Sequence, residues 1–365
     1  MLAVPNPVDP DDALDTEGRQ LLYDLVSTPS VSGEEADAAA VLVEFLEAHG
    51  REAFVDEVGN VRAPADDSLL LTSHVDTVPG EVPVDVADGD EELGVEGPVL
   101  WGRGSVDATG PLAAMAVAAV ETGVSFVGVT GEETDSRGAR HLVETRDAPE
   151  AVINGEPSGW DAVTLGYRGL ISGTYVATSE SGHTSRPDPN AVEHAIHWWQ
   201  RVEGAFDYYD YGAVFEQVTT KPVAVDGGLS EDGLSMEATM DVQFRVPPSL
   251  DPEDVRERAD AELDVGTVHW NEPIPPVMGS PRDPVATALR GGIRKAGGDP
   301  RLLRKTGTAD VNLFAGAWDV PMATYGPGDS ALDHAPDERL PLREFDRSVD
   351  VLTDASRRLR GRTDG

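Results

Sequence analysis

Over the first 166 residues, apolar runs of strand length alternate with helical patterns. Two helical patterns fill residues 16–50, and the runs LLLTS, VSFVGV and AVIN follow with helical patterns between them. Alternation of this kind is typical of a mainly parallel sheet covered by helices. The sequence therefore predicts an α/β fold.

All three runs lead directly into an acid or a histidine. His74 follows LLLTS, and Glu156 follows AVIN. Glu132 and Glu133 come just after VSFVGVT. Open α/β sheets place their ligands at the carboxyl ends of the strands, so these side chains are expected to meet at one edge. Asp107 instead precedes the helical run PLAAMAVAAV, which places it in a loop at a helix N-terminus.

Together with His334 in LDHAPDE, these residues supply the ligands of a two-metal hydrolase. Two ions about 3.5–4 Å apart need a bridging carboxylate, further ligands on each ion and a base beside the shared water. Asp107 can bridge, and each histidine can bind one ion. Two of the three glutamates can complete the shells, and the third then serves as the base. Nitrogen and oxygen ligands without thiolate suit zinc best, with cobalt or manganese as alternatives.

Asp76 lies two residues after His74 and has a separate expected role. Its carboxylate can accept the second N–H of the imidazole and fix the tautomer of the ring. The alternative is an ordinary turn residue in VDTVPG.

The composition limits the class of protein. The net charge is -39, with 67 acidic and 28 basic residues, which excludes general nucleic-acid binding and attraction to anionic membranes. The acids are scattered and lysines are few, which suggests a high-salt cytoplasm. There is no cysteine, so disulfides and thiolate metal sites do not arise. The N-terminus lacks the pattern of a secretory signal, and no apolar run approaches about 20 residues, so a cytoplasmic protein is expected.

A chain of 365 residues is expected to form two domains. After about residue 166 the pattern changes to two β-α-β halves, which fit a small α/β sandwich of the ferredoxin-like kind. The predicted organisation is a catalytic domain at 1–166, an inserted lid or dimerisation domain at 167–274, and the second part of the catalytic domain at 275–365. The metal site is therefore expected to draw ligands from both sides of the insertion.

The ordered ligand motifs resemble the zinc-dependent aminoacylase and carboxypeptidase family, which includes acetylornithine deacetylase and succinyl-diaminopimelate desuccinylase. The resemblance spans essentially the whole chain. It implies one ion on His74, Glu133 and the bridging Asp107, and a second ion on Glu156, His334 and Asp107. It also implies a homodimer.

The same resemblance implies Glu132 as the general base and Asp76 as the partner of His74. In many relatives a cis peptide follows the bridging aspartate, which here is the Asp107–Ala108 bond. The chain departs from the family pattern at Thr109, where relatives often carry lysine.

Further motifs narrow the resemblance. GRGSVDATGPLA, GEPSG, LGYRG, SGHTSRP, KTGTADVNLFA and YGPGDSALDHAPDE are similar to enzymes that release lysine or ornithine from an amino-group carrier protein. These enzymes act in lysine and arginine biosynthesis and cleave the amide on the side chain of the carrier's C-terminal glutamate. A halophilic archaeal source fits the composition. The alternatives are a small-molecule N-acyl amino acid deacylase, a dipeptidase and a metal-free binding protein. Lysine and ornithine differ by one methylene, so the sequence does not separate them.

Substrate-binding residues are expected outside the ligand set. His183 in SGHTSRP resembles the family's histidine over the substrate carbonyl, and Arg245 in QFRVPP resembles its carboxylate-binding arginine. A basic rim of Arg168, Arg186 and Arg245 is expected to guide docking of the carrier.

The segment KTGTADVN is expected to form a polar loop that lines the substrate pocket. Asp310 in this loop is the candidate partner for the side-chain ammonium of the leaving amino acid. The other candidates in the loop are Lys305, Thr306, Thr308 and Asn312.

Overall fold

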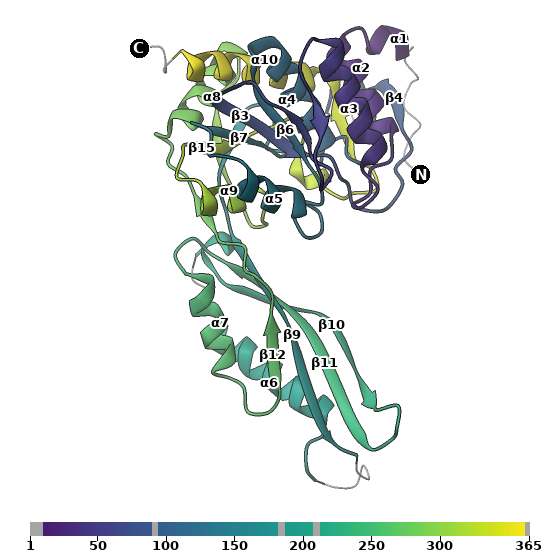
Figure 1. The fold of residues 1–365 in the computed structure, drawn as a ribbon, viewed down its shortest axis with the longest axis vertical. Coiled ribbons are helices and arrows are strands. Elements are labelled where there is room, and N and C mark those ends of the chain that lie inside the picture. The colour runs from purple at the N-terminus through teal and green to yellow at the C-terminus, as the bar shows by residue number, and fades with distance from the viewer. Residues whose placement is uncertain (1–9, 90–93, 182–186, 207–211, 362–365) are drawn as a thin grey trace. The chain divides into compact units, whose positions relative to one another are not determined.

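The computed structural model describes residues 10–89, 94–181, 187–206 and 212–361, and the chain forms two compact units (Figure 1). The first unit comprises the chain up to Leu165, Gly279–Leu303 and the residues from Ala309 onward. The second comprises Gly166–Met278 and Arg304–Thr308. The insertion expected at 167–274 lies within the second unit. The short segment Arg304–Thr308 also belongs there, although the sequence pattern assigned it to the catalytic domain.

The main sheet is parallel at its centre and antiparallel at its edges. Strands β6, β3, β7 and β15 pair in parallel, whereas β1, β2, β8 and β13 join through antiparallel pairs. The α/β prediction is confirmed, but the antiparallel edges were not visible in the sequence. The strands in sheet order are β1 (Phe54–Val55), β2 (Val61–Ala63), β6 (Val124–Val129), β3 (Asp66–His74), β7 (Val152–Gly155), β15 (Met322–Thr324), β8 (Ala162–Tyr167) and β13 (Val277–Met278), with β14 (Arg301–Lys305) also on β8.

Helices cover this sheet because each has an apolar face. The alanine-rich α4 ends where Gly123 adopts a left-handed φ of 71°, a conformation that favours glycine. Thr16 precedes α2, and its side-chain hydroxyl oxygen caps the helix by accepting a hydrogen bond from the amide of Arg19. The helices of the first unit are α1 (Pro10–Ala13), α2 (Glu17–Ser27), α3 (Ala36–Ala48), α4 (Thr109–Thr122), α5 (Arg137–Thr145), α8 (Pro284–Lys295), α9 (Val311–Ala317) and α10 (Leu342–Arg360), with a 3-10 turn η2 (Ser330–Leu332).

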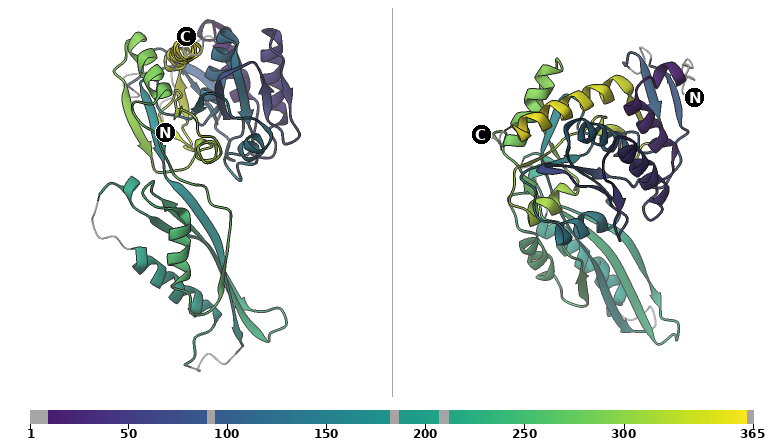
Figure 2. Two further views of the ribbon diagram at one scale, coloured as in Figure 1. Left: turned by 60° about the vertical axis from the view of Figure 1, so that its left-hand side comes forward. Right: turned by 45° about the horizontal axis from the view of Figure 1, so that its top comes forward.

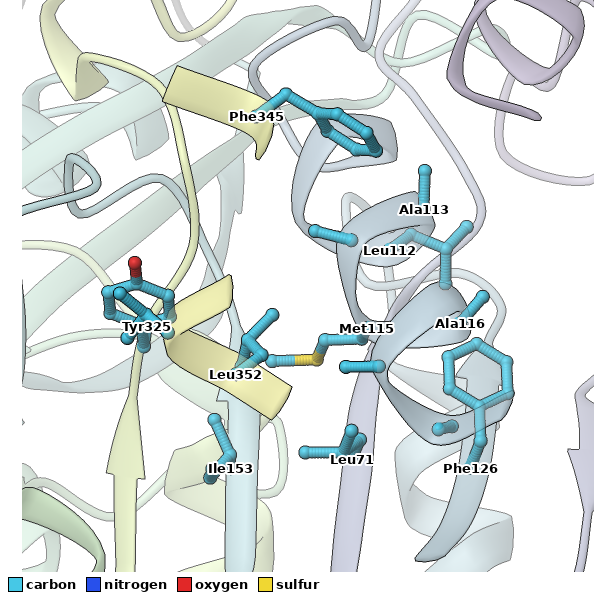
Figure 3. Packing of buried hydrophobic residues seen from close by; sticks show 14 of the residues in the cluster. Leu71, Leu112, Ala113, Met115, Ala116, Phe126, Ile153, Tyr325, Phe345 and Leu352 are labelled. Carbon is cyan, nitrogen blue, oxygen red and sulfur yellow. The ribbon is translucent and has the colours of Figure 1, made fainter. Parts of the chain in front are cut away.

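The core of the first unit lies between the sheet and helices α4 and α10 (Figure 3). Leu71, Phe126 and Ile153 come from three neighbouring strands, while Met115 and Leu352 come from the two helices. All five side chains are fully buried. Burying a side chain of this size contributes about 1.5–3 kcal/mol, so this layer holds the strand ends in fixed positions.

A second, small sheet lies beside the main one in the first unit. It consists of β4 (Asp85–Asp88), β5 (Pro98–Trp101) and β16 (Arg339–Pro341), and both of its pairings are antiparallel. The segment that carries Asp107 leaves β5, and the segment that carries His334 enters β16. This sheet therefore brings together two ligand segments that are far apart in the sequence.

The second unit is a four-stranded antiparallel sheet with helices α6 (Ala191–Phe206) and α7 (Pro252–Asp260) on one face (Figures 1 and 2). The sheet order is β10 (Thr219–Leu229), β11 (Ser235–Val246), β9 (Gly169–Glu180) and β12 (Thr267–Trp270), and a 3-10 turn η1 (Val214–Glu216) precedes β10. Along the chain the order is β-α-β-β-α-β, as in ferredoxin-like sandwiches. Trp198 stacks on Tyr175 in its core, with ring centroids 4.7 Å apart.

Within the described part of the chain, no helix combines the length and the apolar character needed to cross a membrane.

Candidate metal centre

The three predicted strand ends meet in the first unit. β3 ends at His74 and lies between β6 and β7, with His74 in register with Val129 and Ser73 in register with Gly155. Glu132 follows β6 and Glu156 follows β7, so both glutamates leave the sheet beside the imidazole. The parallel alignment of these strands explains why the acids gather at one edge.

Asp107 joins the two histidines. One carboxylate oxygen, Oδ1, lies 3.2 Å from Nε2 of His74, and the other, Oδ2, lies 3.2 Å from Nε2 of His334. The same nitrogen of His334 lies 3.0 Å from Oε1 of Glu133. Each oxygen of Asp107 thus faces a different imidazole, which is the arrangement expected of a bridging carboxylate.

The Asp107–Ala108 peptide is cis, as the family resemblance implies. The next residue, Thr109, opens α4 and is buried, and its amide donates to the carbonyl of Gly104 at 2.9 Å. The departure from lysine at this position therefore sits inside the fold rather than at an open surface.

The two glutamates act on the histidines in different ways. His334 contacts Glu133, whereas the carboxylate of Glu156 acts electrostatically on His74. Ligand atoms of His74, Asp107 and Glu133 do lie within 4.8 Å of one another, as the predicted first group requires. The direct contact of 3.0 Å nevertheless favours Glu133 as a ligand of the ion that His334 would hold.

Opposite charges and burial shift the pKa values in this cluster. Burial alone would raise the pKa of Asp107, but hydrogen bonds from His334 and His74 outweigh it and hold that pKa well below its usual range. The hydrogen bond to Asp107 raises the pKa of His334 to about 9. Burial opposes charging of His74, yet Asp107, Glu132 and Glu156 raise its pKa well above 6.5. In the absence of metal, protons on the histidines compensate the excess negative charge of the acidic groups in this cluster. Bound cations could compensate the same charge.

The carboxylate of Asp76 holds the loop that carries the two glutamates. Its Oδ1 accepts from the amide of Glu132 at 3.1 Å, and its Oδ2 accepts from the amide of Glu133 at 3.1 Å. Oδ2 also accepts from the hydroxyl of Ser32 at 2.7 Å. Asp76 is fully buried, so these charge-assisted bonds form away from water.

The partner of the His74 ring differs in detail from the expectation. Nδ1 of His74 lies 2.8 Å from the main-chain carbonyl of Asp76, whereas the nearest carboxylate oxygen is 3.6 Å away. The hydrogen bond that fixes the tautomer is therefore made by the backbone of Asp76 rather than by its side chain. The carboxylate is left free to bind the amides of the glutamate loop.

Burial raises the pKa of Glu132 well above its usual value, and the neighbouring charge of Glu156 raises it further. Burial likewise raises the pKa of Glu133. A carboxylate with a raised pKa accepts a proton more readily, which suits Glu132 to proton transfer. Two bound cations would lower these pKa values again.

One arginine of the predicted basic rim is buried. Arg168 is only 5% exposed, and it donates to the carbonyls of Thr306, Val214 and Gln217 inside the second unit. Its guanidinium therefore holds the local fold instead of facing a partner. Arg186 and the predicted His183 lie outside the described residues.

Arg245 is partly exposed, and its Nη1 donates to Oγ1 of Thr308 at 3.0 Å. Both residues belong to the second unit, as does Lys305, which is also partly exposed. The structure thus brings together two of the predicted substrate-binding residues, Arg245 and Thr308.

The first half of the KTGTADVN segment is exposed or partly exposed, and its second half is buried. That the segment lines the substrate pocket stays a prediction. Asn312 is fully buried, and its Oδ1 accepts from the amide of Ala309 at 3.0 Å, which closes the turn into α9. Asp310 is 2% exposed, and burial raises its pKa to about 7. The Asn312 side chain therefore serves the turn. The Asp310 carboxylate does not cap α9, and His74 and Asp76 act on it electrostatically.

Two residues of the site were missed in the sequence. Ser32 supports Asp76, and Glu338 accepts from the amide of Asp107 at 3.1 Å. Ser32 lies in a turn far from any ligand motif and carries no local signal. Glu338 ends the motif LDHAPDE, so its position four residues after His334 was a signal that could have found it.

The donor set fits divalent metal ions. Two atoms bound to one tetrahedral zinc ion at about 2.0–2.2 Å lie roughly 3.3–3.6 Å apart. The separations of 3.0–3.2 Å between Asp107, Glu133 and the two histidines are slightly shorter than that spacing, so small outward shifts would admit the ions. Imidazole and carboxylate ligands without sulfur suit zinc, cobalt or manganese.

Comparison with known proteins gives consistent results. The sequence profile of the protein family described as peptidase family M20/M25/M40 matches residues 70–358 of this chain. A LysW-lysine hydrolase of Deinococcus radiodurans is 40% identical, over 94% of this chain and 97% of its own length. A protein of Thermococcus kodakarensis, provisionally named LysW-lysine/LysW-ornithine hydrolase, is 37% identical over 94% of this chain and 92% of its own length.

Solved structures share the fold. An M20 family metallo-carboxypeptidase from Sulfolobus solfataricus superposes with a TM-score of 0.75 at 18% identity. The match covers 94% of this chain and 99% of that one.

Proposed function

The chain belongs to peptidase family M20/M25/M40, and on that premise we propose that it is a two-metal amidohydrolase that releases lysine, ornithine or both from an amino-group carrier protein. The family resemblance drawn from the motifs is confirmed by the family match and by the relatives. The bond to be cleaved is the amide between the amino acid and the side-chain carboxyl of the carrier's C-terminal glutamate. LysW, named in both relatives, is the carrier that this proposal takes as the partner.

The observation that carries the catalytic part of the proposal is the position of Asp107 between the two imidazoles. Its two oxygens lie at equal distances of 3.2 Å from His74 and His334. We propose that His74, Glu156 and Asp107 hold one ion, and that His334, Glu133 and Asp107 hold the other. This replaces the pairing expected from the sequence, because Glu133 directly contacts His334.

Zinc is the proposed native metal, with cobalt as the alternative, and the ions when bound would lower the pKa of a water molecule and polarise the substrate carbonyl. Glu132 would take the proton of the attacking water on a carboxylate oxygen. It would then pass that proton to the nitrogen of the leaving amino acid, which departs as an amine. Asp76 keeps Glu132 in place through the amide that it binds at 3.1 Å.

Recognition of the leaving amino acid requires a cation for its α-carboxylate. We propose Arg245 for this role, supported by its partial exposure and by Thr308, which holds its guanidinium at 3.0 Å. A role of His183 over the scissile carbonyl, a homodimer, a cytoplasmic location and a halophilic source stay predictions. Sedimentation of the purified protein tests the dimer, and activity measured against salt concentration tests the halophilic character.

The deciding experiment measures amino-acid release from carrier protein loaded separately with lysine and with ornithine, beside free N-acetylornithine. Release from the carrier alone supports the proposal, and the two rates rank lysine against ornithine. Release only from N-acetylornithine would instead assign the protein to the small-molecule deacylases.

Two controls complete this assay. Glu132→Gln should abolish release while keeping the metal content, which shows that release depends on this site. Full metal occupancy with no amidase activity on any of the substrates would leave a binding protein and overturn the proposal.

A further inference from the structure

The carboxylate of Glu338 lies directly behind the shared ligand Asp107. Its Oε1 accepts from the amides of Val106 at 2.9 Å and Asp107 at 3.1 Å. The side chain is fully buried, and it stands four residues after His334. One buried carboxylate thus connects the backbone of one ligand segment with the chain that carries the other.

Arg103 completes the connection. Its Nη1 donates to Oε2 of Glu338 at 2.7 Å and to the carbonyl of Ala335 at 3.3 Å, and its Nε donates to the carbonyl of Gly80 at 3.0 Å. The amide of Gly102 donates to the carbonyl of Glu338 at 3.2 Å. Side chain and backbone therefore tie residues 102–107 to residues 335–338 at several points.

These contacts extend a regular sheet. β5 and β16 pair with Trp101 opposite Arg339, so the bond from Gly102 to Glu338 is the next step of the same ladder. The tie between the two ligand segments is consequently anchored in hydrogen-bonded strands. It does not depend on a flexible loop.

In the part of the chain that the structure describes, the imidazole of His334 makes few other contacts that would fix its position. The side chain of His334 is 50% exposed, and within the described residues its ring contacts are with Asp107 and Glu133. Its backbone adopts a left-handed φ of 60°, which is uncommon for a residue other than glycine. With half of the ring in water, its position over Asp107 depends on where the backbone puts it.

We propose that Glu338, held by Arg103, is a positioning residue that sets His334 against Asp107 and thereby sets the affinity for one of the two metal ions. The inference rests on the proposed two-metal function. It assigns Glu338 no contact with the substrate. Outer groups that orient a metal ligand change metal affinity by about 10–100-fold when they are lost.

The test is metal binding to chelator-treated protein, which needs no substrate. Zn²⁺ is titrated by calorimetry, and Co²⁺ is titrated by its visible absorption, into the wild type and Glu338→Gln. The wild type should bind two ions. In Glu338→Gln one ion should bind as in the wild type and the other about 10–100-fold more weakly, with a changed Co²⁺ spectrum. Wild-type affinity for both ions would overturn the proposal, even if the variant melts earlier.

A matched control is Glu35→Gln. Glu35 is also a buried glutamate paired with an arginine, at 2.6 Å from Arg137, and within the described residues it contacts neither Asp107 nor His334. It should lower the melting temperature while both ions bind as in the wild type. Equal weakening of metal binding in this control would show that any lost ion pair suffices, and would overturn the specific role of Glu338.

A double variant separates positioning from general support. If Glu338 acts through His334, then Glu338→Gln combined with His334→Ala should bind metal no more weakly than His334→Ala alone. Additive weakening would contradict the proposal. If Glu338→Gln does not fold, Arg103→Lys should weaken the same ion by a smaller factor, and unchanged binding there would count against it. A wild type that binds two ions but releases nothing from the carrier would refute the proposed substrate and leave this inference standing.

Discussion

The two imidazoles of the site are held in different ways. His74 ends a central strand, its side chain is 1% exposed, and the carbonyl of Asp76 fixes its ring at 2.8 Å. His334 lies outside the main sheet, and its side chain is 50% exposed. We define the interior half as His74, Asp76 and the loop 131–135, and the outer half as His334 with its segment up to Glu338.

The difference shows that the ligands on the two sides of Asp107 are held in place by different kinds of interaction. The interior half is positioned by burial in a sheet whose strands are locked by the core (Figure 3). The outer half is tied to the Asp107 segment through Glu338, which accepts hydrogen bonds from the amides of Val106 and Asp107 and from Arg103. Packing is rigid because interiors are dense, whereas an exposed group is free to move unless its backbone is tied. The interior half should therefore tolerate substitution less well.

The largest loss of activity is expected from substitution of Glu132, the proposed proton acceptor of the interior half. Glu132→Gln should lower kcat by about 10²–10⁴-fold, because the amide cannot take the proton of water. Both ions and the melting temperature should stay as in the wild type. The matched variant Glu133→Gln should instead lose affinity for the ion that His334 holds. Substantial activity in Glu132→Gln would place the base elsewhere.

Next in size is the loss of the Asp76 charge. Asp76→Asn should lower the free energy of unfolding by about 2–3 kcal/mol, because an amide nitrogen would face the main-chain N–H of Glu132 or Glu133. Urea unfolding of metal-free protein measures this. If the free energy of unfolding falls no more than it does for substitution of an exposed side chain, the interior half is held by packing alone.

The pH dependence of the metal-free protein tests the outer half. The pKa of His334 is raised from 6.5 to about 9 by its bond to Asp107. Its stabilising effect is then fully present below about pH 6.5 and lost as the pH rises through 9. Because the ring is half exposed, screening should limit the effect to about 1 kcal/mol.

His334→Ala is the control for this pH dependence. Subtracting its unfolding curve removes the contribution of His74, whose pKa is also raised. Identical pH profiles in the wild type and the variant would show that the exposed pair contributes nothing to stability.

The smallest change in stability is expected for Ser32, which contacts the interior half through Asp76. Ser32→Ala removes one hydrogen bond of 2.7 Å to Asp76 and should cost about 1 kcal/mol of unfolding free energy. Metal binding should not change, since the amides of Glu132 and Glu133 still hold the carboxylate. A loss of metal affinity would mean that Ser32 orients the glutamate loop itself.

Much of the interior half could be predicted from the sequence, for a local reason. His74 and the loop 131–135 each follow a short apolar run, and the end of a run marks the end of a strand. Parallel strands bring such ends to one edge. The burial of Asp310 and Asn312 could not be predicted in this way, because a polar stretch of sequence does not reveal whether its side chains face water.

The outer half required the tertiary structure. Nothing near Asp107 in the sequence points to Glu338, since 231 positions separate the two residues that share this hydrogen bond. The pairing of β5 with β16 brings them together, and the register of that pair follows from the whole fold. The contact between Glu133 and His334 was not predicted for the same reason.

By itself, the sequence determined the fold class and the family, and it supplied the candidate ligand residues, because periodicity and residue chemistry are local properties. Only the tertiary structure decided which glutamate contacts His334, which predicted pocket residues are buried, and which groups tie the His334 segment to the Asp107 segment. Those outcomes depend on distances between segments far apart in the chain, and such distances are set jointly by packing and hydrogen bonding across the entire domain.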